Sequence, residues 1–177
     1  MVLAALFSHS LRSLKNTGIT APIYAVLQGL FLGGISAIYE SQFDGIVVQA
    51  VGLTLGTLSS LLVLYKTGIV KPTENFRLMV TSATMGIGLL YLVSMIMNMF
   101  GSSIGFIHSN GLFGIGFSLF VVAIAALNLV LDFDFIEQGS EQGAPKYMEW
   151  FGAFSLMVTL IWLYLEMLRL LAKMRSR

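Results

Sequence analysis

Residues 112–131 read LFGIGFSLFVVAIAALNLVL and contain no charged side chain. A transmembrane helix needs about 20 predominantly apolar residues to cross the hydrocarbon core of a bilayer. With this stretch included, five segments have the required length and character, at about 21–39, 45–65, 78–100, 112–131 and 147–172. The sequence therefore predicts an all-α fold, a polytopic bundle of five transmembrane helices.

The composition excludes a water-soluble globule. Of the 177 residues, 56% are hydrophobic and 11% are charged, whereas a soluble domain has about 45–50% apolar and about 25% charged residues. The mean hydropathy of +0.85 agrees with a location in lipid. The chain has no cysteine, which excludes disulfides and thiolate metal sites. Its net charge of +1 gives no support for binding to nucleic acid.

The connections between the spans are short, so we expect one integral membrane domain over residues 1–177. Residues 1–20 depart from the regular pattern. Residues 1–7 are apolar but too short to span, and Arg12 and Lys15 follow them, whereas a signal peptide carries its positive charge before the apolar segment. We expect residues 1–20 to be a partial span or an interfacial segment.

The basic residues indicate the orientation, because short cytoplasmic loops collect Lys and Arg. Basic residues precede the first span and occupy the loop at 66–77, whereas the loops at 40–44 and 101–111 contain none. We therefore expect the N-terminus in the cytoplasm, and five crossings would place the C-terminus outside. Four basic residues nevertheless lie at 169–177. Either the last segment is re-entrant or broken, or the charge rule fails here.

Small residues recur four positions apart in several spans, which lets helix backbones approach closely in lipid. The residues are Gly29 and Gly33, Gly52 and Gly56, Ser82 and Gly86, and Gly114 and Ser118. We interpret these faces as helix-packing surfaces rather than as a substrate groove. The partners expected for such a chain are the lipid bilayer and other integral membrane proteins.

Two acidic residues lie in or beside apolar runs. Glu166 falls within LYLEMLRLL at 163–171, and Asp132 directly follows the fourth span. A charged side chain at the centre of a bilayer costs about 2.5–3.5 kcal/mol on insertion scales, so such residues face the bundle interior and indicate function. The structural alternatives are an ion pair of Glu166 with Arg169 on the same helix and a hydrated Asp132 at the membrane interface.

A contact between the carboxylates of Asp132 and Glu166 would form a proton-sensitive cation site. Two buried carboxylates in contact cannot both ionise cheaply and therefore share a proton, and carboxylate oxygens suit hard cations such as Ca²⁺. In a straight hairpin that turns at about 139–145 they would not meet, because Asp132 lies about 10 Å and Glu166 about 30 Å from the turn. Contact requires that the chain after Asp132 stay helical or dip back into the membrane. Asp134 and Glu149 are the further candidate acids.

The segments around these acids resemble the Bax inhibitor family of multi-spanning membrane proteins, in particular its bacterial branch. The similarity lies in DFDFI at 132–136, LYLEMLRLL at 163–171 and LQGLFLGGIS at 27–36. The five spans match the last five helices of the family's seven-helix bundle, so the first helix and most of the second are expected to be missing. The resemblance implies that Asp132 and Glu166 are the proton sensor and gate of a calcium leak.

Three departures from the family pattern bear on this role. Glu166 stands in place of an aspartate, which keeps the carboxylate but lengthens the side chain. Gln28 stands where the family usually has a glutamate, so one acid is lost. The spacing of 34 positions between Asp132 and Glu166 is also longer than the family's by about the length of a hairpin.

The leading hypothesis is a pH-sensitive calcium or cation leak channel in the plasma (inner) membrane of a bacterium. Ca²⁺ would be the transported or bound ion at Asp132 and Glu166, and no other cofactor is expected. The alternative is a non-conducting adaptor that binds a membrane protease or another integral membrane protein. An enzyme is not expected, because cysteine is absent, the two histidines are isolated, and the sequence contains neither a His-Glu-x-x-His motif nor a phosphate-binding glycine loop.

Overall fold

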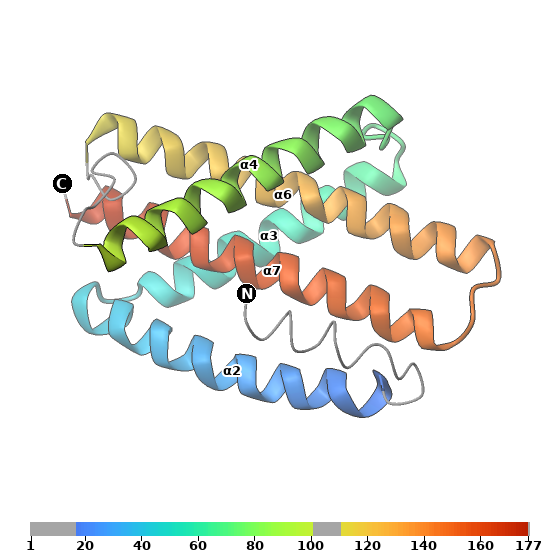
Figure 1. Ribbon diagram of the computed structural model, residues 1–177, viewed down its shortest axis with the longest axis horizontal. Helices are drawn as coiled ribbons and strands as arrows, with labels where there is room; N and C mark the ends of the chain where they lie inside the picture. Colours follow the sequence, from blue (N-terminus) through green and yellow to red (C-terminus); the bar gives the residue numbers. More distant parts are fainter. Residues whose placement is uncertain (1–16, 101–110, 177) are drawn as a thin grey trace.

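The computed structural model of the protein describes residues 17–100 and 111–176 (Figure 1). Within these ranges the chain forms five long helices: α2 (Thr17–Gln42), α3 (Ile46–Lys66), α4 (Glu74–Met99), α6 (Leu112–Glu141) and α7 (Tyr147–Arg175). Each contains a stretch that is long and apolar enough to cross a membrane. The prediction of an all-α, polytopic helix bundle is confirmed, and the chain is an integral membrane protein.

Helix α6 continues well beyond its uncharged stretch and ends at Glu141. It does so because Phe133, Phe135 and Ile136 carry the apolar pattern onward. Asp132 therefore lies inside the helix, where its side chain is buried, and not at a hydrated helix end.

The last helix is a simple crossing. Gly143 adopts a left-handed conformation (φ 63°) in the turn after α6, and α7 then runs without interruption from Tyr147 to Arg175. A re-entrant or broken final segment is thus not seen within residues 147–175. Residues 1–16, which hold most of the expected partial or interfacial segment, lie outside the described residues.

Polar contacts at the connections determine where two helices begin. Gly45 has a left-handed φ of 75° before α3, and the Glu40 carboxylate accepts hydrogen bonds from the backbone N–H groups of Gly45 (2.6 Å) and Val47 (3.0 Å). Glu40 thereby supplies the negative charge that the first turn of α3 lacks. At α4, the hydroxyl of Thr73 accepts a hydrogen bond from the N–H of Phe76 and caps the helix.

Helix α7 occupies the middle of the bundle. It packs against α6, α3 and α2, and α4 packs mainly against α6. Figure 1 shows α2 running beside α7 and α4 crossing α7 at an angle. The side chains of α7 are therefore the ones that several other helices can reach.

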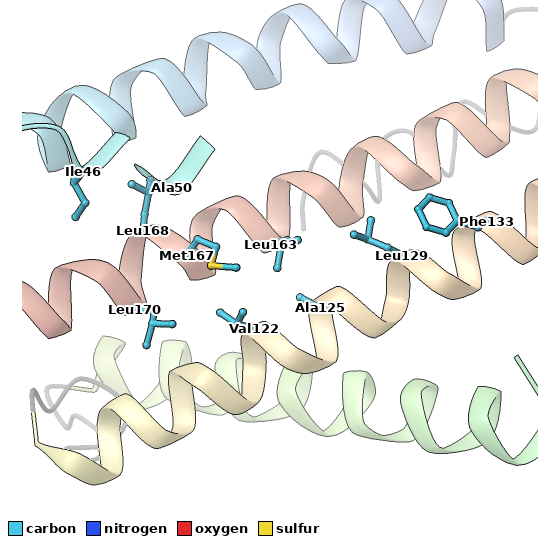
Figure 2. Close-up of a cluster of buried hydrophobic side chains, with 10 residues drawn as sticks. All are labelled: Ile46, Ala50, Val122, Ala125, Leu129, Phe133, Leu163, Met167, Leu168 and Leu170. Atoms are coloured by element: carbon cyan, nitrogen blue, oxygen red, sulfur yellow. The ribbon is translucent and has the colours of Figure 1, made fainter. Parts of the chain in front are cut away.

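The main core lies between α3, α6 and α7 (Figure 2). It is formed by the buried side chains of Ile46, Ala50, Val122, Ala125, Leu129, Phe133, Leu163, Met167, Leu168 and Leu170. Large apolar side chains on the outer faces are exposed, among them Leu30, Val48 and Met85. Exposed apolar surface of this extent is typical of a protein that contacts lipid acyl chains.

The glycine faces differ from the expectation. Gly29, Gly33, Gly52, Gly56 and Gly86 are exposed, and a Cβ atom at any of them would meet nothing within 4 Å. These residues do not bring two described helices together, so packing through them stays a prediction for contacts with other proteins.

Close approach occurs instead at the hairpin of α6 and α7. At Gly152 of α7, a Cβ atom would lie 2.9 Å from Cγ1 of Ile136 on α6. On α6, Gly114 and Ser118 are buried, as expected of a packing face.

Candidate functional site

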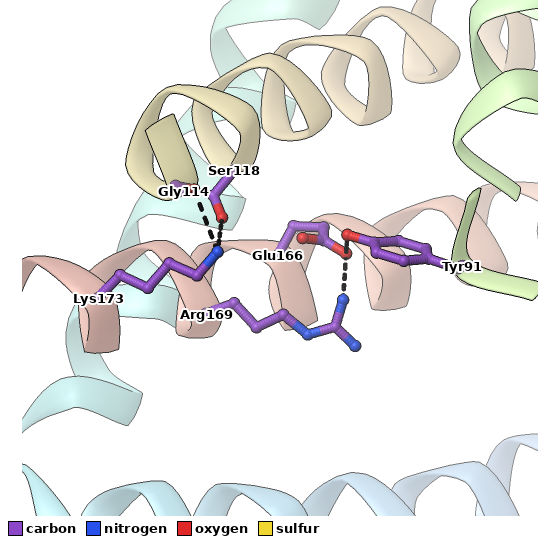
Figure 3. A network of polar contacts seen from close by, with 6 residues as sticks. All are labelled: Tyr91, Gly114, Ser118, Glu166, Arg169 and Lys173. Atoms are coloured by element: carbon purple, nitrogen blue, oxygen red, sulfur yellow. Dashed lines mark hydrogen bonds and ion pairs between the residues drawn. The ribbon is translucent and has the colours of Figure 1, made fainter. Parts of the chain in front are cut away.

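Glu166 is buried in the second half of α7, with 1% of its surface exposed. Its Oε1 atom accepts hydrogen bonds from the hydroxyl of Tyr91 on α4, at 2.9 Å, and from Nη1 of Arg169, at 2.6 Å (Figure 3). The guanidinium also lies 5.2 Å from the centre of the Tyr91 ring. A buried carboxylate is tolerated when a charge and hydrogen bonds compensate its desolvation, and these two residues supply both. The intrahelical ion pair that the spacing predicted is confirmed.

Lys173 lies one turn beyond Arg169, on the same face of α7. Its Nζ atom donates hydrogen bonds to the backbone oxygen of Gly114 (3.1 Å) and to Oγ of Ser118 (2.8 Å), both on α6 (Figure 3). These bonds fasten the end of α7 to the first two turns of α6. A second cation is thereby held two turns beyond Glu166 on α7.

Asp132 forms a separate polar contact further along α6. Its Oδ1 atom accepts a 2.6 Å hydrogen bond from the hydroxyl of Ser155 on α7, and Thr159, one turn along α7, lies beside the same carboxylate. Its second oxygen, like Oε2 of Glu166, is buried without a hydrogen-bond partner in the described part of the chain. Each of the two carboxylates therefore keeps one oxygen uncommitted.

The structure does not bring Asp132 and Glu166 together. Asp132 lies level with Ser155 and Thr159, which precede Glu166 by eleven and seven residues on one continuous helix. At about 1.5 Å per residue, this places the two carboxylates about 10–16 Å apart along the helix axis. The chain after Asp132 does stay helical, as contact would require. Because the hairpin of α6 and α7 is straight, however, the helical turns after Asp132 do not bring its carboxylate to the level of Glu166.

Two further acids of α6, Asp134 and Glu137, face other helices. Asp134 accepts hydrogen bonds from Arg77 of α4, with which it forms an ion pair, and from Gln138 at 3.0 Å. Glu137 accepts a hydrogen bond from the hydroxyl of Tyr65 on α3. Because successive helical residues are rotated by about 100°, the three acids 132, 134 and 137 reach α7, α4 and α3, respectively.

Glu149, the fourth candidate acid, is exposed in the first turn of α7. It is not among the partners of Asp132. The partners that do matter, Tyr91, Arg77 and Ser155, were not identified from the sequence. The one local sign of these partners in the sequence is their residue type, since tyrosine, arginine and serine are polar residues within or beside an apolar span.

The described residues do not assemble a cage for a resident metal ion. Residues 17–100 and 111–176 contain no group of three or more His, Cys, Asp or Glu side chains that could hold one. Ca²⁺ takes six to eight oxygen ligands, whereas a guanidinium nitrogen lies 2.6 Å from Oε1 of Glu166. In this arrangement Arg169 occupies the position of a cation at Glu166.

Comparisons with known proteins agree with the resemblance seen in the sequence. A scan against protein-family models matches residues 1–176 to the family described as Bax inhibitor 1 like. Searches of curated proteins and of solved structures found no match to the chain. Since the family match extends over almost the whole length, this integral membrane protein belongs to the Bax inhibitor 1 like family.

Proposed function

We propose that the protein is a pH-sensitive cation leak channel, with calcium as its ion, in the inner membrane of a bacterium. Asp132 and Glu166 act in it as two successive carboxylate sites and not as one contacting pair. No chemical step on a substrate is part of this role, so the protein is not an enzyme. Membership of the Bax inhibitor 1 like family supports a membrane function of this kind.

The observation that carries the proposal is the uncommitted oxygen on each buried carboxylate. Unpaired buried carboxylate oxygens are costly, and acids inside a membrane bundle mark ion or proton pathways. Two such oxygens, at levels about 10–16 Å apart along α7, would divide the crossing of a hydrocarbon core of about 30 Å into shorter steps. Conduction needs sites that bind a cation and release it again, and successive carboxylates meet this need.

In the proposed channel, we take the ion pair of Arg169 and Glu166 as the closed state. Arg169 neutralises Glu166, and its positive charge repels a cation that approaches this site. An open path requires the guanidinium to leave the carboxylate. Protonation of Asp132 removes a negative charge that attracts the cation, so the flux should rise as pH rises.

The test is calcium flux from proteoliposomes of the purified chain over a pH series. We expect a flux that increases with pH in the parent protein and that falls at least several-fold, with a flattened pH dependence, in Asp132→Asn and Glu166→Gln. Glu149→Gln is the matched control, because Glu149 is an exposed acid of the same helix and should conduct like the parent. Equal flux in the parent and all three variants would overturn the proposal.

The alternative function is a non-conducting adaptor for another integral membrane protein, such as a membrane protease. A specific observation favours it. Gly29, Gly33 and Gly34 lie on α2 with no atom within 4 Å of a Cβ position, beside the exposed side chains of Leu30 and Phe31. Small residues on an open helix face allow the backbone of a second helix to approach closely.

The two functions respond to different variants. An adaptor loses its co-purifying partner on Gly29→Leu and keeps it on Glu166→Gln. A channel shows the reverse dependence, with flux insensitive to Gly29→Leu and reduced by Glu166→Gln. A chain that gives no flux above empty liposomes and keeps a partner that Gly29→Leu releases would establish the adaptor role.

A further inference from the structure

A groove of about 650 Å³ lies between α2 and α4 and is also lined by α6 and α7. Gln28 of α2 forms one wall, and Ser94 and Asn98 of α4 form the other. Its floor is the face of α7 together with the start of α6. Among the described residues, those of α2 and α4 line its two sides, and a lipid chain would enter between these two helices.

One end of the groove is positively charged. Arg169 and Lys173 both line it, and its described lining residues include no acid. Glu166 lies behind Arg169 and Tyr91 and does not line the groove. The Arg169 side chain is 45% exposed, and Figure 3 shows its second terminal nitrogen pointing away from Glu166. The guanidinium can therefore hold Glu166 with one nitrogen and a second anion with the other.

The two cations lie at the depth of lipid headgroups. Helix α7 has 29 residues, which gives a length of about 44 Å, equal to the full thickness of a bilayer with its polar regions, about 40–45 Å. Lys173 lies two residues before the end of this helix and Arg169 lies one turn deeper. Both side chains therefore meet the boundary between headgroups and acyl chains.

The other end of the groove is apolar. Val158, Ile161 and Leu165 continue its floor along α7 toward the middle of the helix, and Trp162 lines it as well. A small soluble anion would use only the charged end of such a groove. An amphipathic anion matches both ends, with its charge at Arg169 and Lys173 and its chain along these residues.

We propose that this groove binds one anionic phospholipid, whose headgroup phosphate is bound by Arg169 and attracted by the positive charge of Lys173, while Lys173 keeps its hydrogen bonds to α6. Basic pockets between transmembrane helices are suited to anionic headgroups, and each cation near the surface contributes about 1 kcal/mol. Ser94 and Asn98 lie at the same end of α4 and supply hydrogen-bonding groups beside the phosphate. The inference does not depend on conduction, because it rests on the groove and its cations alone.

The test measures thermal unfolding of the purified full chain in a neutral detergent as phosphatidylglycerol or phosphatidylcholine is added. We expect phosphatidylglycerol to raise Tm more than phosphatidylcholine does. Lys173→Gln should raise the half-saturating phosphatidylglycerol concentration about fivefold, whereas Lys173→Arg should leave it nearly unchanged. Arg175→Gln is the matched control, because Arg175 is a cation of the same helix end that contacts Asp44 and Gln49 and does not line the groove.

A second measurement is the fluorescence of Trp162, which lines the groove, with all groove side chains left unchanged. The chain has two tryptophans, and Trp150→Phe leaves Trp162 as the single tryptophan, which can be excited selectively. Phosphatidylglycerol with brominated acyl chains should quench Trp162 more than brominated phosphatidylcholine at the same mole fraction. Equal effects of the two lipids in both measurements would overturn the proposal, as would equal stabilisation by soluble glycerol phosphate.

Discussion

The hydroxyl of Ser155 on α7 donates a hydrogen bond of 2.6 Å to the carboxylate of Asp132 on α6. This contact fixes the level of Asp132 in the hairpin and holds it two to three turns from Glu166. Rotation of the two side chains cannot close that distance, and only sliding of α6 along α7 would do so. The Asp132 carboxylate is therefore a site of its own.

Cross-linking can test this separation directly, because the chain has no natural cysteine. Cysteines that replace Asp132 and Ser155 should be joined by a short bifunctional maleimide within one chain. Cysteines that replace Asp132 and Glu166 should not be joined under the same conditions. Gel mobility after proteolysis between the two sites, for example in the α6–α7 turn, reports the outcome. Equal cross-linking of both pairs would show that the carboxylates meet.

Ser155→Ala should destabilise the protein by about 1–3 kcal/mol, because it removes a hydrogen bond from a carboxylate that is only 8% exposed. The measurement is the free energy of unfolding in detergent. Ser59→Ala is the control. Ser59 is exposed, and among the described residues its hydroxyl donates a hydrogen bond to the Leu55 oxygen of its own helix alone, so the change should stay within about 0.5 kcal/mol. A Ser155→Ala variant within the same range would contradict the assignment.

The ion pair of Glu166 and Arg169 predicts an asymmetric mutant cycle. The two side chains are 1% and 45% exposed, respectively. Arg169→Gln leaves a buried carboxylate without its charge partner and should cost about 1–3 kcal/mol. Glu166→Gln leaves an arginine that water can reach and should cost less.

The double variant completes this cycle. Because it removes the stranded carboxylate, we expect the protein with both changes to be more stable than Arg169→Gln alone. Unfolding in detergent without anionic lipid measures all four proteins under one condition. Additive losses would show that the two residues do not act as a pair.

The membrane-spanning helices could be predicted from the sequence because hydropathy is a local property. The stretch at 112–131 has no charge, and Phe133, Phe135 and Ile136 indicate that its helix continues. The rise per residue also predicted that Asp132 and Glu166 do not meet in a straight hairpin, and the structure has a straight hairpin. Their contact followed from the family resemblance and is not formed here.

The partners that the acids have on other helices could not be predicted, because they lie at large sequence separations. Tyr91 is 75 positions from Glu166, and Arg77 is 57 positions from Asp134. Which helix faces meet depends on how the helices are rotated and packed. Apolar residues reveal little about this rotation, because the faces that contact lipid and those that contact protein are both apolar. The glycine pairs illustrate the same limit, since Gly52 and Gly56 have the packing motif and face outward.

Gly152 and Gly86 should respond to alanine with opposite signs. A Cβ atom at Gly152 would lie 2.9 Å from Cγ1 of Ile136, so the gain in helix propensity is outweighed by overpacking, which costs about 1–3 kcal/mol. A Cβ atom at Gly86 would meet nothing within 4 Å, and Gly86→Ala should stabilise the protein by about 0.5–1 kcal/mol. Adding Ile136→Ala should restore the Gly152→Ala variant, because it removes the clashing atom. Unfolding in detergent distinguishes the cases, and equal stabilisation by Gly152→Ala and Gly86→Ala would mean that α6 and α7 are not in close contact at this position.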